Sequence, residues 1–259
     1  MKKYFVIFVI TCLTVYIFLA MRKNQKPSTP AFTGKTIHFK STDGLTIYGD
    51  LYLIKDTSKP FILLFHQANY SRGEYRSIAQ NLNKMGFNCL AIDQRAGGTV
   101  NDVENKTNKE AIALNLKTDY ENAYLDLESA LLYVNNTFKP FKTILWGSSY
   151  SASLVFILAS NYPKNVSGII AFSPGEYFTF HGNSILTYAH NIQCPTFITA
   201  TKAESMTCQN IFNQVQSKHK LLFIPPTNGQ HGSSALWKNN AGNKTYWKVL
   251  TDFFETIVN

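Results

Sequence analysis

The sequence of 259 residues is long enough for one large domain or two small ones, and its 45% hydrophobic residues can fill a sizeable core. The net charge of +9 is uneven, because five basic residues and no acid lie in the first 26 positions, which leaves +4 for the rest of the chain. With no dense stripe of arginine and lysine beyond that point, the composition argues against nucleic acid as a partner.

The first segment is set apart by its hydropathy. Residues 4–21 form an uncharged, largely apolar run with a pair of basic residues on each side. Since about 20 apolar residues span a bilayer as a helix, we expect residues 1–23 to be an uncleaved transmembrane anchor; a cleaved signal peptide is the alternative. Residues 24–33 are typical of a linker, and the folded domain is expected at 34–259.

The anchor also bears on location. Positive charge on both sides of the apolar run leaves its orientation in the membrane open. A short basic stretch followed by one apolar segment is typical of a chain whose remainder is exported. We therefore expect the domain to lie outside the cytoplasm, in the periplasm or at the cell surface.

Strand and helix patterns alternate through the domain. An antiparallel pair of strands is predicted first, around the turn at Asp43-Gly44. Apolar runs that indicate buried strands then alternate with segments of helical period, which predicts a mostly parallel sheet with helices on both faces. The predicted strands are 36–40, 45–54, 61–65, 89–92, 143–146, 167–172, 196–200 and 221–225, and the predicted helices are 75–85, 119–134, 151–160, 206–217 and 245–257.

Two local features bear on a helix start and on the cysteines. Ser71-Arg72-Gly73-Glu74 has the form of a capping box, in which the glutamate serves the start of the helix that follows. Cys194 and Cys208 are close enough in sequence for a disulfide in an oxidising compartment, and free thiols are the alternative. The sequence has no CxxC motif and no Cys/His cluster, so we expect neither a zinc site nor another cofactor.

The strongest indication of chemistry is Gly147-Ser148-Ser149-Tyr150-Ser151, between a predicted strand and a predicted helix. A sharp turn in this place lifts its central serine out of the chain as a nucleophile, and the pattern is usually G-x-S-x-G. Here Ser151 replaces the last glycine, which is tolerable because serine is still small. Ser149 is therefore the candidate nucleophile.

A nucleophilic serine needs a base, usually histidine, and an acid that orients the base. Of the six histidines, His231 lies just past the last predicted strand, where loops at the carboxyl ends of parallel strands hold functional sites. If the acid lies between Ser149 and His231, only Glu176 and Glu204 are available. We favour Glu204, after strand 196–200, and keep Glu176 as the alternative.

Acyl transfer also needs donors for the oxyanion, which are usually backbone N–H groups. One is expected from Tyr150, at the start of the helix after Ser149. The other is expected from the loop after strand 61–65, where Gln67 is the candidate.

Together these motifs resemble the α/β-hydrolase family over roughly residues 35 to 259. The resemblance implies Ser149 as nucleophile, His231 as base, Glu204 as acid and an oxyanion loop at Gln67, although the usual acid of the family is aspartate. More narrowly, the chain is similar to dienelactone-hydrolase-like bacterial proteins in 64–68, 93–95, 146–151 and 231–237.

The resemblance also bears on the substrate. Many members carry a helical cap, but here the connection 174–194 is short and aromatic, and the insertion 96–117 is a second candidate wall of the pocket. The sequence thus predicts a serine hydrolase with a minimal cap that cleaves carboxylic esters with a small or medium acyl group. The alternatives are a peptidase or amidase with the same triad, and a non-catalytic binding protein on a hydrolase fold.

Overall fold

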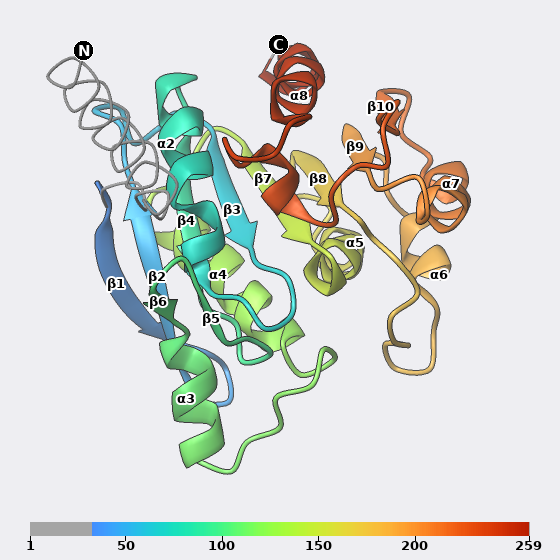
Figure 1. Ribbon diagram of the computed structural model, residues 1–259. Coiled ribbons are helices and arrows are strands. Elements are labelled where there is room, and N and C mark those ends of the chain that lie inside the picture. Colours follow the sequence, from blue (N-terminus) through green and yellow to red (C-terminus); the bar gives the residue numbers. More distant parts are fainter. Residues whose placement is uncertain (1–32, 259) are drawn as a thin grey trace, which may run out of the picture. The chain divides into compact units, whose positions relative to one another are not determined.

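The computed structural model describes residues 33–258, which form an eight-stranded sheet in the order β1-β2-β4-β3-β7-β8-β9-β10 (Figure 1). The first two strands pair antiparallel with each other, and β2 is antiparallel to β4, whereas the strands from β4 to β10 run parallel. The strands are β1 (Lys35–Lys40), β2 (Thr46–Tyr52), β3 (Phe61–Phe65), β4 (Asn88–Ile92), β7 (Thr143–Ser148), β8 (Gly168–Phe172), β9 (Thr196–Thr199) and β10 (Lys220–Phe223).

Helices connect the parallel strands, as the alternation in the sequence predicts. A two-stranded hairpin, β5 (Thr99–Val100) and β6 (Val103–Glu104), follows β4. The helices are α2 (Arg76–Lys84), α3 (Lys106–Ala113), α4 (Tyr124–Thr137), α5 (Tyr150–Asn161), α6 (Ile185–Ala189), α7 (Ser205–Gln214) and α8 (Asn243–Val258), with 3₁₀ turns η1 (Arg72–Tyr75) and η2 (Ser233–Leu236).

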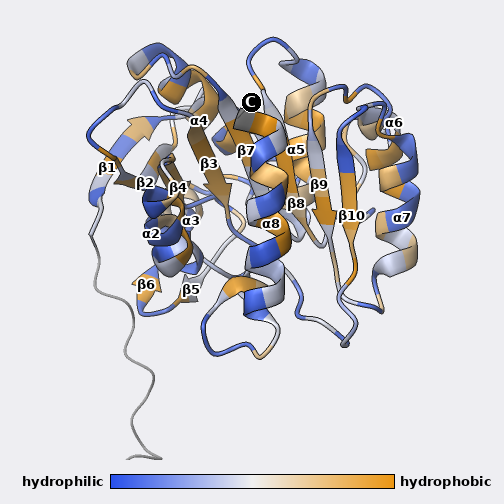
Figure 2. Cartoon of the chain, turned by 90° about the horizontal axis from the view of Figure 1, so that it is seen from above, coloured by the Kyte–Doolittle hydropathy of each residue, from blue (hydrophilic) through white to orange (hydrophobic). Residues whose placement is uncertain are grey.

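The sheet is buried on both faces. Every residue of β3, β4, β7 and β8 is buried, as expected for parallel strands between helix layers (Figure 2). Side chains of β3 alternate: Phe61, Leu63 and Phe65 pack with α4 and α5, whereas Ile62 and Leu64 pack with α2 and α8. The mostly parallel α/β sheet inferred from the sequence is therefore the observed fold.

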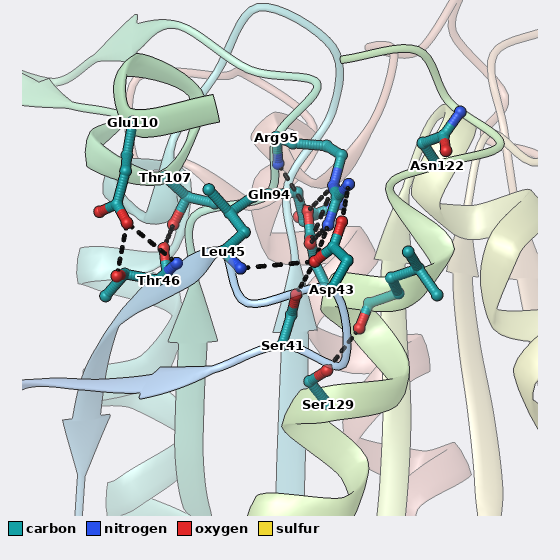
Figure 3. A network of polar contacts seen from close by, with 12 residues as sticks. Ser41, Asp43, Leu45, Thr46, Gln94, Arg95, Thr107, Glu110, Asn122 and Ser129 are labelled. Carbon is teal, nitrogen blue, oxygen red and sulfur yellow. Dashed lines mark hydrogen bonds and ion pairs between the residues drawn. The ribbon is translucent and has the colours of Figure 1, made fainter. Parts of the chain in front are cut away.

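A buried ion network ties the antiparallel hairpin to the parallel part of the sheet (Figure 3). Arg95, just after β4, pairs with Asp126 of α4 at 2.8 Å and with Asp43 of the β1–β2 turn at 2.7 Å. Burial alone would raise the pKa of Asp43, but hydrogen bonds from Arg95 and Ser41 lower it to about 2. The three charged residues thus hold the ends of three elements together.

The described residues include three of the four cysteines but not the predicted anchor. The proposed anchor at 1–23 and nearly all of the linker lie outside the described residues, and between residues 33 and 258 no helix is long and apolar enough to cross a membrane. Cys89, Cys194 and Cys208 are free thiols.

Candidate active site

The loops after β3, β7, β8, β9 and β10 all leave the same edge of the sheet, because these strands are parallel. This edge is where α/β folds place their sites. The predicted residues Gln67, Ser149, Glu204 and His231 follow four of these five strands.

Ser149 stands alone between the end of β7 and the start of α5, with φ of 60°. This left-handed conformation is costly for a residue other than glycine and is often found at functional sites. Gly147 makes the turn possible, since a Cβ there would lie 2.3 Å from the backbone oxygen of Ser151. The Ser151 hydroxyl in turn contacts the backbone oxygens of His66 and, at 3.2 Å, of Phe65, so the residue that departs from the family pattern ties the turn to the end of β3.

His231 Nδ1 contacts Glu204 Oε1. Glu204 Oε2 accepts two further hydrogen bonds, from the Ser173 hydroxyl at 2.9 Å and the Thr201 N–H at 3.0 Å. Burial alone would raise the pKa of Glu204, but the hydrogen bonds from His231 and Thr201 lower it to about 2. An ionised carboxylate thus holds one ring nitrogen of His231, and the other nitrogen, Nε2, is the one that can exchange a proton.

Glu176, the alternative acid, has a different place. Its carboxylate accepts the N–H groups of Ile185 at 2.9 Å and Leu186 at 3.0 Å, at the start of α6. Of the two acids between Ser149 and His231, the structure brings Glu204 to the histidine and leaves Glu176 on a helix terminus.

The segment after His231 packs against the serine turn. The N–H of Ser233 donates to the Ser148 hydroxyl at 2.8 Å. Gly232 has a φ of 69°, and a Cβ there would lie 2.6 Å from the Ser148 hydroxyl and 2.2 Å from the side chain of Gln67. Only glycine allows the histidine loop, the serine turn and the loop after β3 to approach this closely.

The two N–H groups expected as oxyanion donors, those of Tyr150 and Gln67, differ in their hydrogen bonding. Tyr150 is the first residue of α5, where N–H groups have no partner within the helix. The N–H of Gln67, however, donates to Glu74 Oε2 at 2.9 Å, so it is not free to stabilise an oxyanion. Among residues 33–258, the next N–H along the loop, that of Ala68, has no hydrogen-bond partner.

Aromatic side chains lie beside the serine. Tyr120 stacks on Tyr150 with ring centroids 4.4 Å apart and meets Phe178 edge-on at 6.0 Å. Tyr177 donates its hydroxyl to the Ser173 backbone oxygen at 2.8 Å. Burial and the charge of Glu204 raise the pKa of Tyr177 to about 12, against a hydrogen bond with the Ser149 side chain. The short connection 174–194 therefore supplies aromatic groups, as predicted, whereas the contribution of Tyr120 was not anticipated.

The insertion 96–117, predicted as a second candidate wall of the pocket, contacts η1 and its N-cap. The Ser71 hydroxyl donates to the Val103 backbone oxygen at 2.7 Å, and the Asn101 amide donates to the Gly73 backbone oxygen at 3.0 Å. Its hairpin thus supports the turn that carries Glu74, a residue that sequence reasoning assigned only to a capping box.

Comparison with known proteins agrees with this architecture. Residues 60–194 match a family model described as alpha/beta hydrolase fold. Among solved structures, a dienelactone hydrolase from Anabaena variabilis superposes with a TM-score of 0.68 at 16% identity, covering 88% of this chain and 99% of its own. An esterase from Pyrococcus furiosus gives 0.68 at 19% identity, with 91% and 97% covered.

A third solved structure, Est1E from Butyrivibrio proteoclasticus, superposes with a TM-score of 0.66 at 11% identity, covering 87% of this chain and 99% of its own. Identities this low show a shared fold and nothing finer. No curated protein matches the chain in sequence. Because the family model covers more than half of the chain, including Ser149 and the loop after β3, the protein belongs to the α/β-hydrolase family.

Proposed function

We propose that the protein is a serine hydrolase that cleaves carboxylic esters through an acyl-enzyme on Ser149, with His231 as the base and Glu204 as the acid. The observation that carries the proposal is the contact between His231 Nδ1 and Glu204 Oε1 at the edge of the sheet where Ser149 stands. The similarity to solved structures described as esterases and as a dienelactone hydrolase supports ester chemistry.

The proposed reaction has two halves. In the first, the Ser149 oxygen attacks the ester carbonyl while its proton passes to His231 Nε2, and the tetrahedral intermediate then expels the alcohol, which takes that proton. In the second, water attacks the acyl-enzyme by the same route and releases the acid. Throughout, ionised Glu204 stabilises the imidazolium and fixes its orientation.

The oxyanion of each tetrahedral intermediate needs two donors. We assign them to the N–H groups of Tyr150 and Ala68, because the N–H of Gln67 is bonded to Glu74. The loss of one such donor costs about 3 kcal/mol in the transition state.

The surroundings of Ser149 favour a small acyl group. The connection 174–194 contains only the five-residue helix α6, so a large lid is absent from this part of the described chain. Tyr177 from this connection interacts with the Ser149 side chain. Phe178 from the same connection packs edge-on against Tyr120, which stacks on Tyr150, the residue after the nucleophile. We therefore propose short or medium acyl esters of small molecules as the substrates.

A fluorophosphonate probe, which reacts with activated serines, tests the proposal directly. Wild type is expected to be labelled and to hydrolyse p-nitrophenyl esters of short acids. Ser149→Ala should abolish labelling and lower turnover by about 10⁴–10⁶-fold, since members of a triad act as a unit. Ser160→Ala, at the far end of the same helix, is the matched control and should behave as wild type.

Each other outcome favours a different reading. Unlabelled, inactive wild type would contradict the proposal and favour a binding protein on a hydrolase fold. Labelling with turnover of p-nitroanilides in place of esters would favour a peptidase or amidase.

The proposal for the N-terminal segment is separate and rests on the sequence. We propose that residues 1–23 anchor the domain in a membrane, with the domain outside the cytoplasm. The full chain should then stay in the membrane fraction after alkaline carbonate extraction, and protease added to intact cells with a permeabilised outer layer should digest the domain. Release of the domain by carbonate, or its protection from protease, would contradict this.

A further inference from the structure

Glu74, at the end of η1, is fully buried beside the candidate site. Its carboxylate accepts two hydrogen bonds: Oε2 from the N–H of Gln67 at 2.9 Å and Oε1 from the hydroxyl of Ser148 at 2.8 Å. Both donors are uncharged. Burying a carboxyl group is costly even when it is hydrogen-bonded, so the position calls for a specific role.

Helix capping does not supply that role. In a capping box the glutamate side chain bonds to the backbone N–H of the serine at the helix start. Here the Ser71 hydroxyl accepts the Gly73 N–H at 3.1 Å, but the Glu74 carboxylate points away from Ser71 to partners in other segments. Ser71 therefore caps the turn alone.

The partners of Glu74 belong to the segments that make up the site. Gln67 lies in the loop after β3, and Ser148 precedes the candidate nucleophile directly. The Ser148 hydroxyl, which donates to Glu74, also accepts the N–H of Ser233, two residues after His231. One carboxylate thus joins the oxyanion loop to the serine turn and, through a single hydroxyl, to the histidine loop.

The backbone around Glu74 is also fixed by contacts with other segments. The indole N–H of Trp237 donates to its backbone oxygen at 2.9 Å. The neighbouring Arg72 is buried between Asp50 at 3.0 Å and Asp93. Together with the hairpin β5–β6, which bonds to η1 from the other side, these contacts make the turn a rigid support.

We propose that Glu74 is a positioning residue of the hydrolase, which sets the oxyanion loop and the serine turn in their active arrangement through Gln67 and Ser148. By accepting the Gln67 N–H, it leaves the N–H of Ala68 as the donor in this loop for the oxyanion. Through Ser148 it fixes the residue next to the nucleophile relative to the segment that carries His231. The inference rests on the proposed ester hydrolysis and adds a residue outside the triad.

Glu74→Gln is the first test, because it keeps the size of the side chain. Glutamine has one acceptor oxygen, so at pH 8, where the wild-type carboxyl is ionised, either the Gln67 N–H or the Ser148 hydroxyl loses its acceptor in the variant. Small misplacements of reacting groups cost up to about 100-fold in rate. We expect kcat on p-nitrophenyl acetate to fall roughly 10- to 100-fold, with KM changed less than about threefold, since the acyl pocket itself is untouched.

The matched control is Glu104→Gln, on the hairpin that braces η1. The Glu104 side chain is exposed and pairs with Lys109 at 3.0 Å. This variant should keep the kcat and KM of wild type. Thermal unfolding of all variants separates loss of position from loss of fold.

A double-mutant cycle with Ser148→Ala decides whether Glu74 acts through Ser148. If it does, the double variant Glu74→Gln/Ser148→Ala should lose little more kcat than the worse single variant. Independent effects would multiply and would overturn this route. Should Glu74→Gln fail to fold, Ser148→Ala alone must still lower kcat and not KM, or the proposal fails.

The outcomes separate this inference from the proposed function. Wild-type activity that is lost in Ser149→Ala but unchanged in Glu74→Gln overturns the role of Glu74 and leaves the hydrolase intact. Inactive, unlabelled wild type overturns the proposed function, and the role of Glu74 with it.

Discussion

Glu204 contacts His231 although 27 positions separate them in the chain. The reason is the register of the sheet: β9 and β10 pair in parallel, and their last residues, Thr199 and Phe223, are partners. The two loops therefore start side by side at the same edge. Glu204, the N-cap of α7, lies on one loop, and His231 lies on the other. The carboxylate and the imidazole therefore meet beyond the ends of the two strands.

This geometry predicts a clear difference between two glutamates. Glu204→Gln keeps the shape but removes the negative charge that favours the imidazolium, so kcat/KM for a short acyl ester should fall by about 10²–10⁴-fold. Glu176→Gln alters only the hydrogen bonds at the start of α6, so kcat/KM should change less than about threefold and stability by about 1 kcal/mol. Steady-state kinetics on both variants provides the measurement, and a larger loss from Glu176→Gln would reverse the choice of acid.

The buried carboxyl of Glu74 predicts a pH-dependent contribution to stability. Burial raises its pKa to about 7, and hydrogen bonds from Gln67 and Ser148 offset this only in part. Between its ordinary value of 4.5 and about 7, the folded protein holds a proton that the unfolded chain has lost, so this contribution is lost as the pH rises through that range. A shift of this size corresponds to about 3 kcal/mol at most.

Glu74→Gln carries no such proton, so wild type should lose stability relative to the variant between pH 5 and pH 8. Denaturant unfolding of both proteins at several pH values measures the difference. The ionisable groups around Glu74 are His231, Tyr70, Tyr75 and Tyr150. Repeating the pair in a His231→Ala background removes the neighbouring imidazole, and parallel pH curves for wild type and variant there would contradict the prediction.

Much of the fold could be predicted because the signals that specify it are local. The apolar run 61–65 coincides with β3, and 167–172 differs from β8 by one residue, since strands buried on both faces must be apolar throughout. The helix predicted at 119–134 begins only at Tyr124. Asp119 explains the difference, because its carboxylate accepts the N–H of Asn122 and holds a turn ahead of the helix.

The site could be predicted where chemistry restricts the choice. Ser149 follows from the strand, turn and helix around it, and Glu204 is one of only two acids in the interval between Ser149 and His231. Neither argument needs coordinates. The contact of Glu204 with His231 then depends on β9 and β10 being neighbours in the sheet.

The role of Glu74 could not be predicted because it depends on distant partners. Its local pattern is that of a capping box, whereas its carboxylate bonds to Gln67 and to Ser148, which is 74 positions away. The same contact occupies the N–H of Gln67, so the proposed oxyanion donor of this loop is the N–H of Ala68. Which of two neighbouring N–H groups in a loop stays without a partner depends on the contacts that other segments make. No local sequence pattern indicates those contacts.

The network around Arg95 predicts a large effect on stability far from the nucleophile. Arg95 and Asp126 are both buried, and removing one member of a buried ion pair leaves a charge without full compensation. Asp126→Asn should therefore lower the free energy of unfolding by about 3–5 kcal/mol. Asp252→Asn breaks an exposed pair with Lys248 and should cost no more than about 1 kcal/mol. Equal effects in urea unfolding would show that the buried network contributes no special stability.

Tyr177 predicts the preference for acyl length. Its hydroxyl bonds to the Ser173 backbone and interacts with the Ser149 side chain, so its ring occupies space beside the nucleophile that a longer acyl chain would need. Tyr177→Ala should raise kcat/KM for p-nitrophenyl octanoate relative to the acetate by about tenfold, because burying each CH₂ contributes about 0.8 kcal/mol.

The matched control for Tyr177→Ala comes from the same connection. Tyr188 donates its hydroxyl to the Phe180 backbone oxygen at 3.1 Å and packs edge-on against the Phe180 ring, with centroids 5.9 Å apart. Tyr188→Ala removes an aromatic ring of equal size without opening space next to Ser149, so the ratio of octanoate to acetate turnover should stay at the wild-type value. The same rise in both variants would mean that loosening the connection, and not the ring of Tyr177, controls acyl length.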